Sequence, residues 1–108
     1  MTVKELSELP GFSPVCLPDP DREVKGGYCG DLLSWVMGRA ESSQAWITIM
    51  SNINIVAVAT LCDVAVIVLS ENVALDDGVK DTAEMRGINV ISTAMPTFEA
   101  AKAIADLV

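Results

Sequence analysis

The chain has 108 residues, of which 51% are hydrophobic and 5% aromatic, which excludes a disordered chain and predicts one domain over residues 1–108. Its formal net charge is −8, from 15 acidic and 7 basic residues, and the bases form no run. This charge excludes nucleic acid and anionic membrane surfaces as partners, because both require a basic footprint.

Cysteine and histidine usage narrows the chemistry further. The three cysteines, Cys16, Cys29 and Cys62, include no C-x-x-C pair, so we expect no zinc or thioredoxin-like site. An odd cysteine count without a signal peptide fits a reducing cytoplasm. Histidine is absent, which removes the Ser-His-Asp and Cys-His mechanisms. No apolar run reaches the ~20 residues of a membrane span.

The first elements are short. Thr2 and Glu5 have the spacing of a capping box, which predicts a two-turn helix that ends at Pro10-Gly11. Residues 13–17 read as a strand bracketed by two prolines, which favours the edge of a sheet. Residues 22–25 are a candidate second strand.

The stretch from Gly26 to Gly38 reads as a glycine-rich turn that leads into a short helix. Asp31 is predicted to be the N-cap of a helix over 32–37, with Gly38 as its C′ residue. We expect Trp35 in the core or in an interface.

Strand and helix patterns then alternate. Residues 45–49 predict a strand, and residues 53–61 a helix capped by Ser51 or Asn52. By propensity the start of that helix could also be a strand, but a crossover is needed before the next strand, over 64–69.

The last third repeats the pattern. Asp76 and Asp77 are expected to cap a helix that Gly87 ends, followed by a strand over 88–91 and a final helix that begins near Pro96. The residues expected to face inward from the two helices are Val79, Ala83, Met85, Phe98, Ala101, Ile104, Ala105 and Val108. Together these elements predict an α/β fold with a mainly parallel sheet.

Ligands bind open parallel sheets outside the carboxyl ends of the strands, which selects the loops 26–31, 50–54, 70–76 and 92–97. The candidate ligand-binding residues are Gly26, Gly27, Tyr28, Asp31, Asn52 and Asn54. The glycine loop is neither a Walker A loop nor a G-x-G-x-x-G motif, and a tight turn in which Asp31 caps a helix is favoured over a ligand loop. The two asparagines could equally be a cap and a satisfied amide. For Asp76-Asp77, a cap is favoured over a metal site.

Four segments together resemble the DRTGG domain family over nearly the whole chain. They are Gly26-Gly27-Tyr28, Asp31-Leu32-Leu33-Ser34, Trp46-Ile47-Thr48 and Asn54-Ile55-Val56-Ala57-Val58-Ala59, with Asp21-Arg22 ahead of them in the family's order. The sequence departs from the family at residues 50–54, where relatives often carry a histidine and this chain has Ser51, Asn52 and Ile53.

The resemblance implies a three-layer α/β/α fold similar to the N-terminal domain of HPr kinase/phosphorylase. It implies a cytoplasmic, non-catalytic regulatory module that forms a homodimer, with a link to hydrogenase-related proteins in anaerobic bacteria. A kinase activity is rejected because the chain lacks a phosphate-binding loop. A small-ligand sensor, for example for a nucleotide, is the alternative. The apolar surface of Leu32, Leu33, Trp35, Met37 and the helix over 53–61 favours the dimer. We expect no cofactor, no metal and no catalytic residue.

Overall fold

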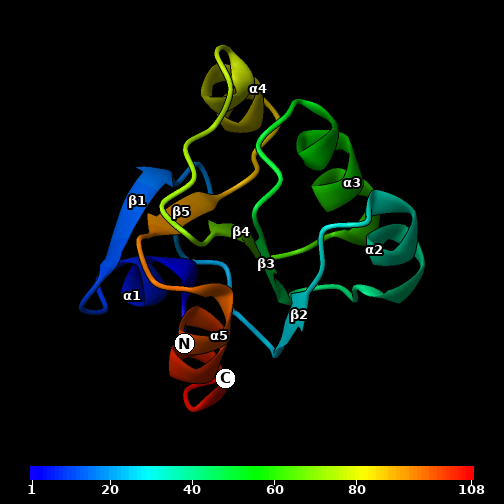
Figure 1. The fold of residues 1–108 in the computed structure, drawn as a ribbon. Helices are drawn as coiled ribbons and strands as arrows, with labels where there is room; N and C mark the ends of the chain where they lie inside the picture. The colour runs from blue at the N-terminus through cyan, green and yellow to red at the C-terminus, as the bar shows by residue number, and fades with distance from the viewer.

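The computed structural model describes residues 1–108, which form one five-stranded sheet with helices on both faces (Figure 1). The strands are β1 (Phe12–Cys16), β2 (Gly27–Cys29), β3 (Ala45–Thr48), β4 (Val66–Leu69) and β5 (Val90–Thr93). The helices are α1 (Val3–Ser7), α2 (Leu33–Arg39), α3 (Asn54–Cys62), α4 (Val79–Met85) and α5 (Thr97–Ala105). None of these helices is long and apolar enough to cross a membrane.

The sheet has the strand order β1-β5-β4-β3-β2. Strands β2 to β5 are parallel, and β1 pairs antiparallel with β5. The predicted mainly parallel sheet is confirmed, and so is the edge position of the proline-flanked first strand. The carboxyl ends of β2, β3, β4 and β5 therefore meet at one edge of the sheet.

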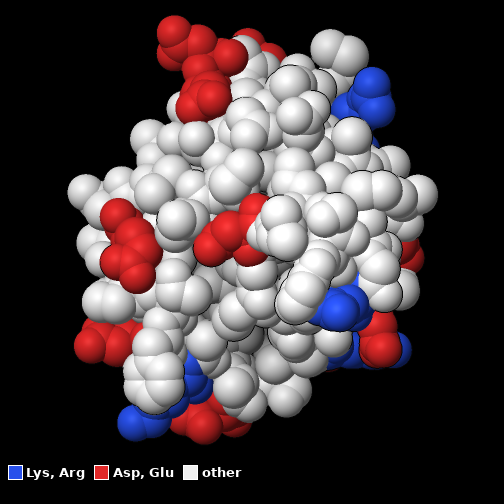
Figure 2. Space-filling model, turned by 45° about the vertical axis from the view of Figure 1, so that its right-hand side comes forward, with Lys and Arg blue, Asp and Glu red and all other residues white.

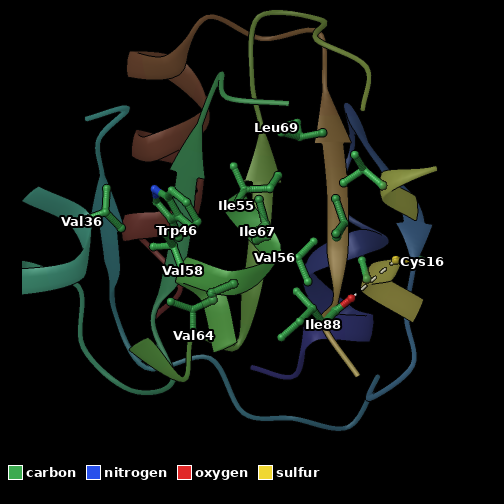
Figure 3. Packing of buried hydrophobic residues seen from close by; sticks show 14 residues of the cluster. Cys16, Val36, Trp46, Ile55, Val56, Val58, Val64, Ile67, Leu69 and Ile88 are labelled. Atoms are coloured by element: carbon green, nitrogen blue, oxygen red, sulfur yellow. Dashed lines mark hydrogen bonds between the residues drawn. The ribbon is translucent and has the colours of Figure 1, made fainter. Parts of the chain in front are cut away.

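Two apolar clusters separate the three layers. Helices α2, α3 and α4 cover one face, where Val36, Ile55 and Val79 pack with Trp46 and residues of β4 and β5 (Figure 3). Helices α1 and α5 cover the other face, over a cluster that includes Leu6 and Ile104. Every residue of β3 and β4 is buried, as expected for parallel strands covered on both sides. The three-layer α/β/α fold is confirmed.

Three local predictions are confirmed by hydrogen bonds or backbone conformation. The Thr2 hydroxyl accepts from the Glu5 N–H at 3.2 Å, and the Glu5 carboxylate accepts from the Thr2 N–H at 2.9 Å, which completes the capping box of α1. The segment that could have been helix or strand is helix α3. Gly87 follows α4 with a φ of 74°, a backbone conformation that favours glycine.

The prediction of a turn over the glycine-rich stretch is wrong. Gly27-Tyr28-Cys29 is strand β2, whereas residues 22–25 supply only an isolated bridge between Glu23 and Thr2. Gly26 has a φ of 84° and turns the chain just before β2. The next three residues can then pair with the edge of β3 that β4 leaves free.

Several predicted helix ends are also wrong. Helix α2 has no side-chain cap, because the Asp31 carboxylate is used elsewhere, and it runs through Gly38 to Arg39. Helix α4 begins after Gly78, whose φ is 82°, and not at Asp76 or Asp77.

Four residues that were predicted to face inward are exposed, namely Met85, Phe98, Ala105 and Val108, and one strand begins later than predicted. Met85 and Phe98 are 85% and 79% exposed, because α4 and α5 turn other residues inward. The buried residues of these helices are Val79, Ala83, Ala100 and Ile104. Strand β5 begins at Val90, two residues later than predicted, since Val90 lies opposite Ile67 of β4.

Candidate functional site

The carboxyl edge of the sheet is a hydrogen-bonded rim. The loop after β3 is joined to the loop after β4 by Ser51, whose hydroxyl donates to Asp76 Oδ1 at 2.8 Å and whose carbonyl accepts from the Asp76 N–H at 3.0 Å. The loop after β4 is joined to the start of α5 by the hydroxyls of Ser70 and Thr97, 2.7 Å apart. This rim holds three of the four loops selected from the sequence in fixed relative positions.

Asp31 connects β2 to the same rim. Its Oδ1 accepts from the hydroxyl of Thr48 at 2.8 Å and from the N–H of Ile49 at 3.0 Å. The Thr48 hydroxyl in turn accepts from the Met50 N–H at 3.1 Å. The sequence predicted a helix cap, but the donors left free at the end of β3 take this carboxylate instead.

Gly26 and Gly27 lie at the amino ends of the parallel strands, opposite the carboxyl edge of the sheet. Gly27 is opposite Ala45, the first residue of β3, and the Gly26 carbonyl accepts from the Ala45 N–H at 3.0 Å. The three residues of β2 then span roughly 10 Å before the chain reaches the carboxyl edge. The two glycines are therefore not part of the loop that ends in Asp31.

Tyr28 is half-buried and packs against the cluster beneath α2 and α3. Its ring lies over Gly30: a Cβ on Gly30 would stand 2.9 Å from the Tyr28 ring. The Gly30 carbonyl accepts from Trp46 Nε1 at 2.9 Å, which ties the same segment to β3. Gly30 is thus explained by packing.

The two asparagines lie at the junction between β3 and α3. Asn52 Oδ1 accepts from the Asn54 N–H, the first of helix α3, at 2.9 Å, but the N-cap residue is Ile53 and not Ser51 or Asn52 as predicted. The Asn54 side chain is exposed and has no intramolecular hydrogen bond. Of the predicted site residues, Asp31, Asn52 and Asn54 therefore share the carboxyl edge, Tyr28 faces the core, and the two glycines lie at the far end of β2.

The largest cavity lies beside a different set of residues, none of which was among the candidate ligand-binding residues. It has a volume of about 600 Å³ and lies between the loop after β4, strands β1 and β5, and the start of α4. Its polar lining includes Ser13, Ser92, Asp77 and Lys80. Ser13 and Ser92 become neighbours only through the antiparallel pairing of β1 with β5. The available signals were the selected loops 70–76 and 92–97, which supply part of the lining, and Asp77, which the sequence placed at a helix cap.

A smaller apolar cavity of about 210 Å³ lies between β2 and α5, lined by residues that include Cys29 and Val108. Burial, followed by the charge of Asp31, raises the pKa of the Cys29 thiol. Burial likewise raises the pKa of Cys16 and of Cys62. The thiols are therefore protonated at neutral pH, which disfavours them as nucleophiles.

Arg22, part of the sequence resemblance, holds segments of the fold together. Its guanidinium donates to Asp63 Oδ1 at 3.0 Å, to the Asp63 carbonyl at 2.7 Å and to the Ser43 hydroxyl at 3.3 Å. These bonds join the chain before β2 to the loop before β3 and to the end of α3. Hydrogen bonds from Ser42 and from Arg22 lower the pKa of Asp63.

No protein-family model matches the chain, and a search of the curated proteins finds no match. Among solved structures, it is similar to the CBS and DRTGG domains of the regulatory region of Clostridium perfringens pyrophosphatase, complexed with its activator, diadenosine tetraphosphate. The TM-score is 0.69 at 14% identity, and the match covers 95% of this chain but 48% of that one. The similarity confirms the resemblance to the DRTGG domain at the level of the fold.

Proposed function

We propose that this protein is a non-catalytic regulatory module that forms a homodimer through helix α2. The observation that carries the dimer is the exposure of large apolar side chains on this helix: Leu32 is 60% exposed, Trp35 56% and Met37 49%. Leu32 and Trp35 are three residues apart and so share one side of the helix, and exposed apolar side chains that lie together are typical of protein interfaces. The similarity to a regulatory region supports the regulatory role.

The surroundings of α2 also favour self-association. Leu32, Trp35 and Arg39 are spaced to share one helical face, and the Arg39 guanidinium stacks 3.7 Å from the centre of the Trp35 ring. Strand β2 next to α2 ends the sheet, so one side of its backbone has no neighbouring strand. Figure 2, which brings this side of the molecule forward, shows broad areas without charged residues. A two-fold dimer would place the same face of each protomer against its partner.

A matched pair of substitutions tests the interface. Trp35→Glu puts a charge into the proposed contact, whereas Phe98→Glu puts the same charge at an exposed apolar residue of α5, on the other side of the sheet. In sedimentation equilibrium we expect Trp35→Glu to be a monomer and Phe98→Glu to remain a dimer. Equal masses for the two variants would contradict an interface at α2.

A second candidate function is nucleotide sensing at Asp31, Asn52 and Asn54. It is favoured by the similar pyrophosphatase region, which is complexed with diadenosine tetraphosphate. At about 100 times its dissociation constant, a ligand stabilises the folded state by roughly 2.7 kcal/mol, which thermal unfolding detects. Asn54→Ala should abolish the shift with diadenosine tetraphosphate without loss of basal stability, because the Asn54 side chain has no intramolecular partner. A shift that survives this substitution would place binding elsewhere.

The sequence resemblance also supports a hydrogenase-related protein as the partner that such a dimer regulates. Purification of the tagged chain from its own cells tests this proposal. Recovery of a hydrogenase-related protein with the wild-type chain but not with Trp35→Glu would assign α2 to both contacts. Recovery of the homodimer alone would contradict the partner.

A further inference from the structure

The 600 Å³ cavity beside β1 has the size of a small-molecule site. Figure 1 shows the connection from β4 crossing beside β5 before it rises to α4, and two hydrogen bonds fix it there. The Glu71 N–H donates to the Met95 carbonyl at 2.8 Å, and the Asn72 N–H donates to the Thr93 carbonyl at 3.0 Å. These two bonds hold the loop after β4, which forms one wall of the cavity, in a fixed position.

The polar groups of the cavity have unused hydrogen-bonding capacity. Ser13 and Ser92 are opposite each other in the β1–β5 pair, and neither hydroxyl has an intramolecular hydrogen bond. Asp77 and Lys80 also line the cavity, and neither forms an ion pair or a side-chain hydrogen bond. Asp76 differs, because its carboxylate is engaged by Ser51. One carboxylate, one ammonium group and two hydroxyls are thus free to meet a ligand.

The lining also limits the kind of ligand. No aromatic residue lines the cavity, so a nucleobase would find no stacking surface. The two aspartates and one lysine at the cavity give its lining a net negative charge, which disfavours polyphosphates at this site. A molecule with both an ammonium and a carboxylate group would pair with Asp77 and Lys80 at once.

We propose that this cavity binds a small zwitterion of the amino-acid class, with its ammonium group at Asp77, its carboxylate at Lys80 and its remaining polar atoms at Ser13 and Ser92. The side chain of the ligand would contact the apolar part of the lining, at Val15 and Leu69. This site is separate from the α2 interface and from Asn54, so the outcome of its test does not depend on the dimer or on nucleotide sensing.

NMR titration of the full chain with each common amino acid, at about 10 mM, tests the proposal, with acetate, methylamine and ATP as single-charge and polyanion probes. We expect at least one amino acid to shift the amides of Ser13, Ser92 and Lys80. Acetate and methylamine should each bind about tenfold more weakly, because each makes only one of the two charged contacts. Absence of shifts at these amides with every amino acid would overturn the proposal, as would tighter binding of ATP.

Substitutions locate the charges. Asp77→Asn and Lys80→Met should each weaken binding about tenfold, as expected for loss of a charged hydrogen bond. Asp81→Asn, at an exposed carboxylate of α4 outside the lining, is the control and should leave the affinity unchanged. Both test residues are exposed, and circular dichroism confirms that the variants fold. Unchanged affinity in Asp77→Asn and Lys80→Met would place the ligand elsewhere and overturn the proposal.

Discussion

At the scale of single residues, two threonines at strand ends show how many hydrogen bonds one hydroxyl can make. Thr48 closes β3 and Thr93 closes β5, and each accepts from the N–H two residues later at 3.1 Å. Thr48 additionally donates to Asp31 at 2.8 Å, whereas Thr93 has no such acceptor. Both side chains are buried, so the pair isolates the contribution of the Asp31 contact.

We predict that Thr48→Val lowers the free energy of unfolding by about 2 kcal/mol and Thr93→Val by about 1 kcal/mol, because a hydrogen bond to a charged group contributes more than a neutral one. Urea denaturation of both variants measures the difference. An equal cost for the two would mean that the Asp31–Thr48 contact does not stabilise the fold.

Asp31 also shows why part of the rim could not be predicted. Read locally, an aspartate before an apolar run is a helix cap, and this rule is sound for isolated helices. The competing donors, Thr48 and Ile49, are 17 and 18 residues away in sequence and reach Asp31 only after β2 has paired with β3. The Asp31 carboxylate could accept from the N-terminus of α2 or from the donors at the end of β3, and the pairing of β2 with β3 brings it to the second. The sequence alone does not show which of these partners is preferred.

At the scale of elements, two glycines test whether backbone conformation or space sets the tolerance for a side chain. Gly38 lies inside α2, and Gly78 precedes α4 with a φ of 82°. A Cβ on either residue would meet nothing within 4 Å. Any difference between alanine substitutions at the two positions must therefore come from the backbone.

We predict opposite signs for these substitutions. Gly38→Ala should raise the free energy of unfolding by about 0.5–1 kcal/mol, because alanine favours a helix, and Gly78→Ala should lower it by about 1 kcal/mol, because alanine disfavours a positive φ. Thermal unfolding measures both. A stabilising Gly78→Ala would show that the turn before α4 can rearrange.

The junction of Arg22, Ser42 and Asp63 joins three elements and makes stability depend on pH. The pKa of Asp63 is lowered in the folded state, so its contribution is present above the unfolded pKa and is lost as the pH falls through the folded value. Because Asp63 is 61% exposed, solvent screening keeps this contribution small.

Asp63→Asn should therefore destabilise the chain at about pH 7 but have less effect at a pH below the lowered folded-state pKa of Asp63, where the wild-type carboxylate is also neutral. Urea denaturation at both pH values gives the comparison, with Asp106→Asn, at an exposed carboxylate outside any salt bridge, as the control. A cost for Asp63→Asn that is the same at both values would exclude the charge as its cause.

At the scale of the whole molecule, hydrophobic patterning was sufficient to predict a mainly parallel sheet, because its strands alternate with helices that serve as crossovers. The three layers were implied by the resemblance to the DRTGG family. Hydrophobic patterning was not sufficient to predict the cavity. That space exists because β5 pairs with β1, which lies nearly eighty residues earlier in the chain, and this pairing places Ser92 opposite Ser13. Ser13 itself carries no local signal, since an exposed serine in an edge strand is ordinary.

The same reasoning explains why Trp35 is informative. The sequence left core or interface open for it, and the structure places it on the surface with Leu32 and Met37. An exposed tryptophan on the helix that directly follows the edge strand β2 is the basis of the proposed dimer. The dimer in turn is what distinguishes an assembling regulatory module from a monomeric ligand-binding domain.

The most direct test of this account is the molar mass of the unmodified chain in solution, measured by light scattering at micromolar concentration. The account predicts about 23 kDa, twice the protomer mass of 11.5 kDa. A mass of 11.5 kDa that does not rise with concentration would contradict the homodimer and leave the apolar surface of α2 without the partner proposed for it.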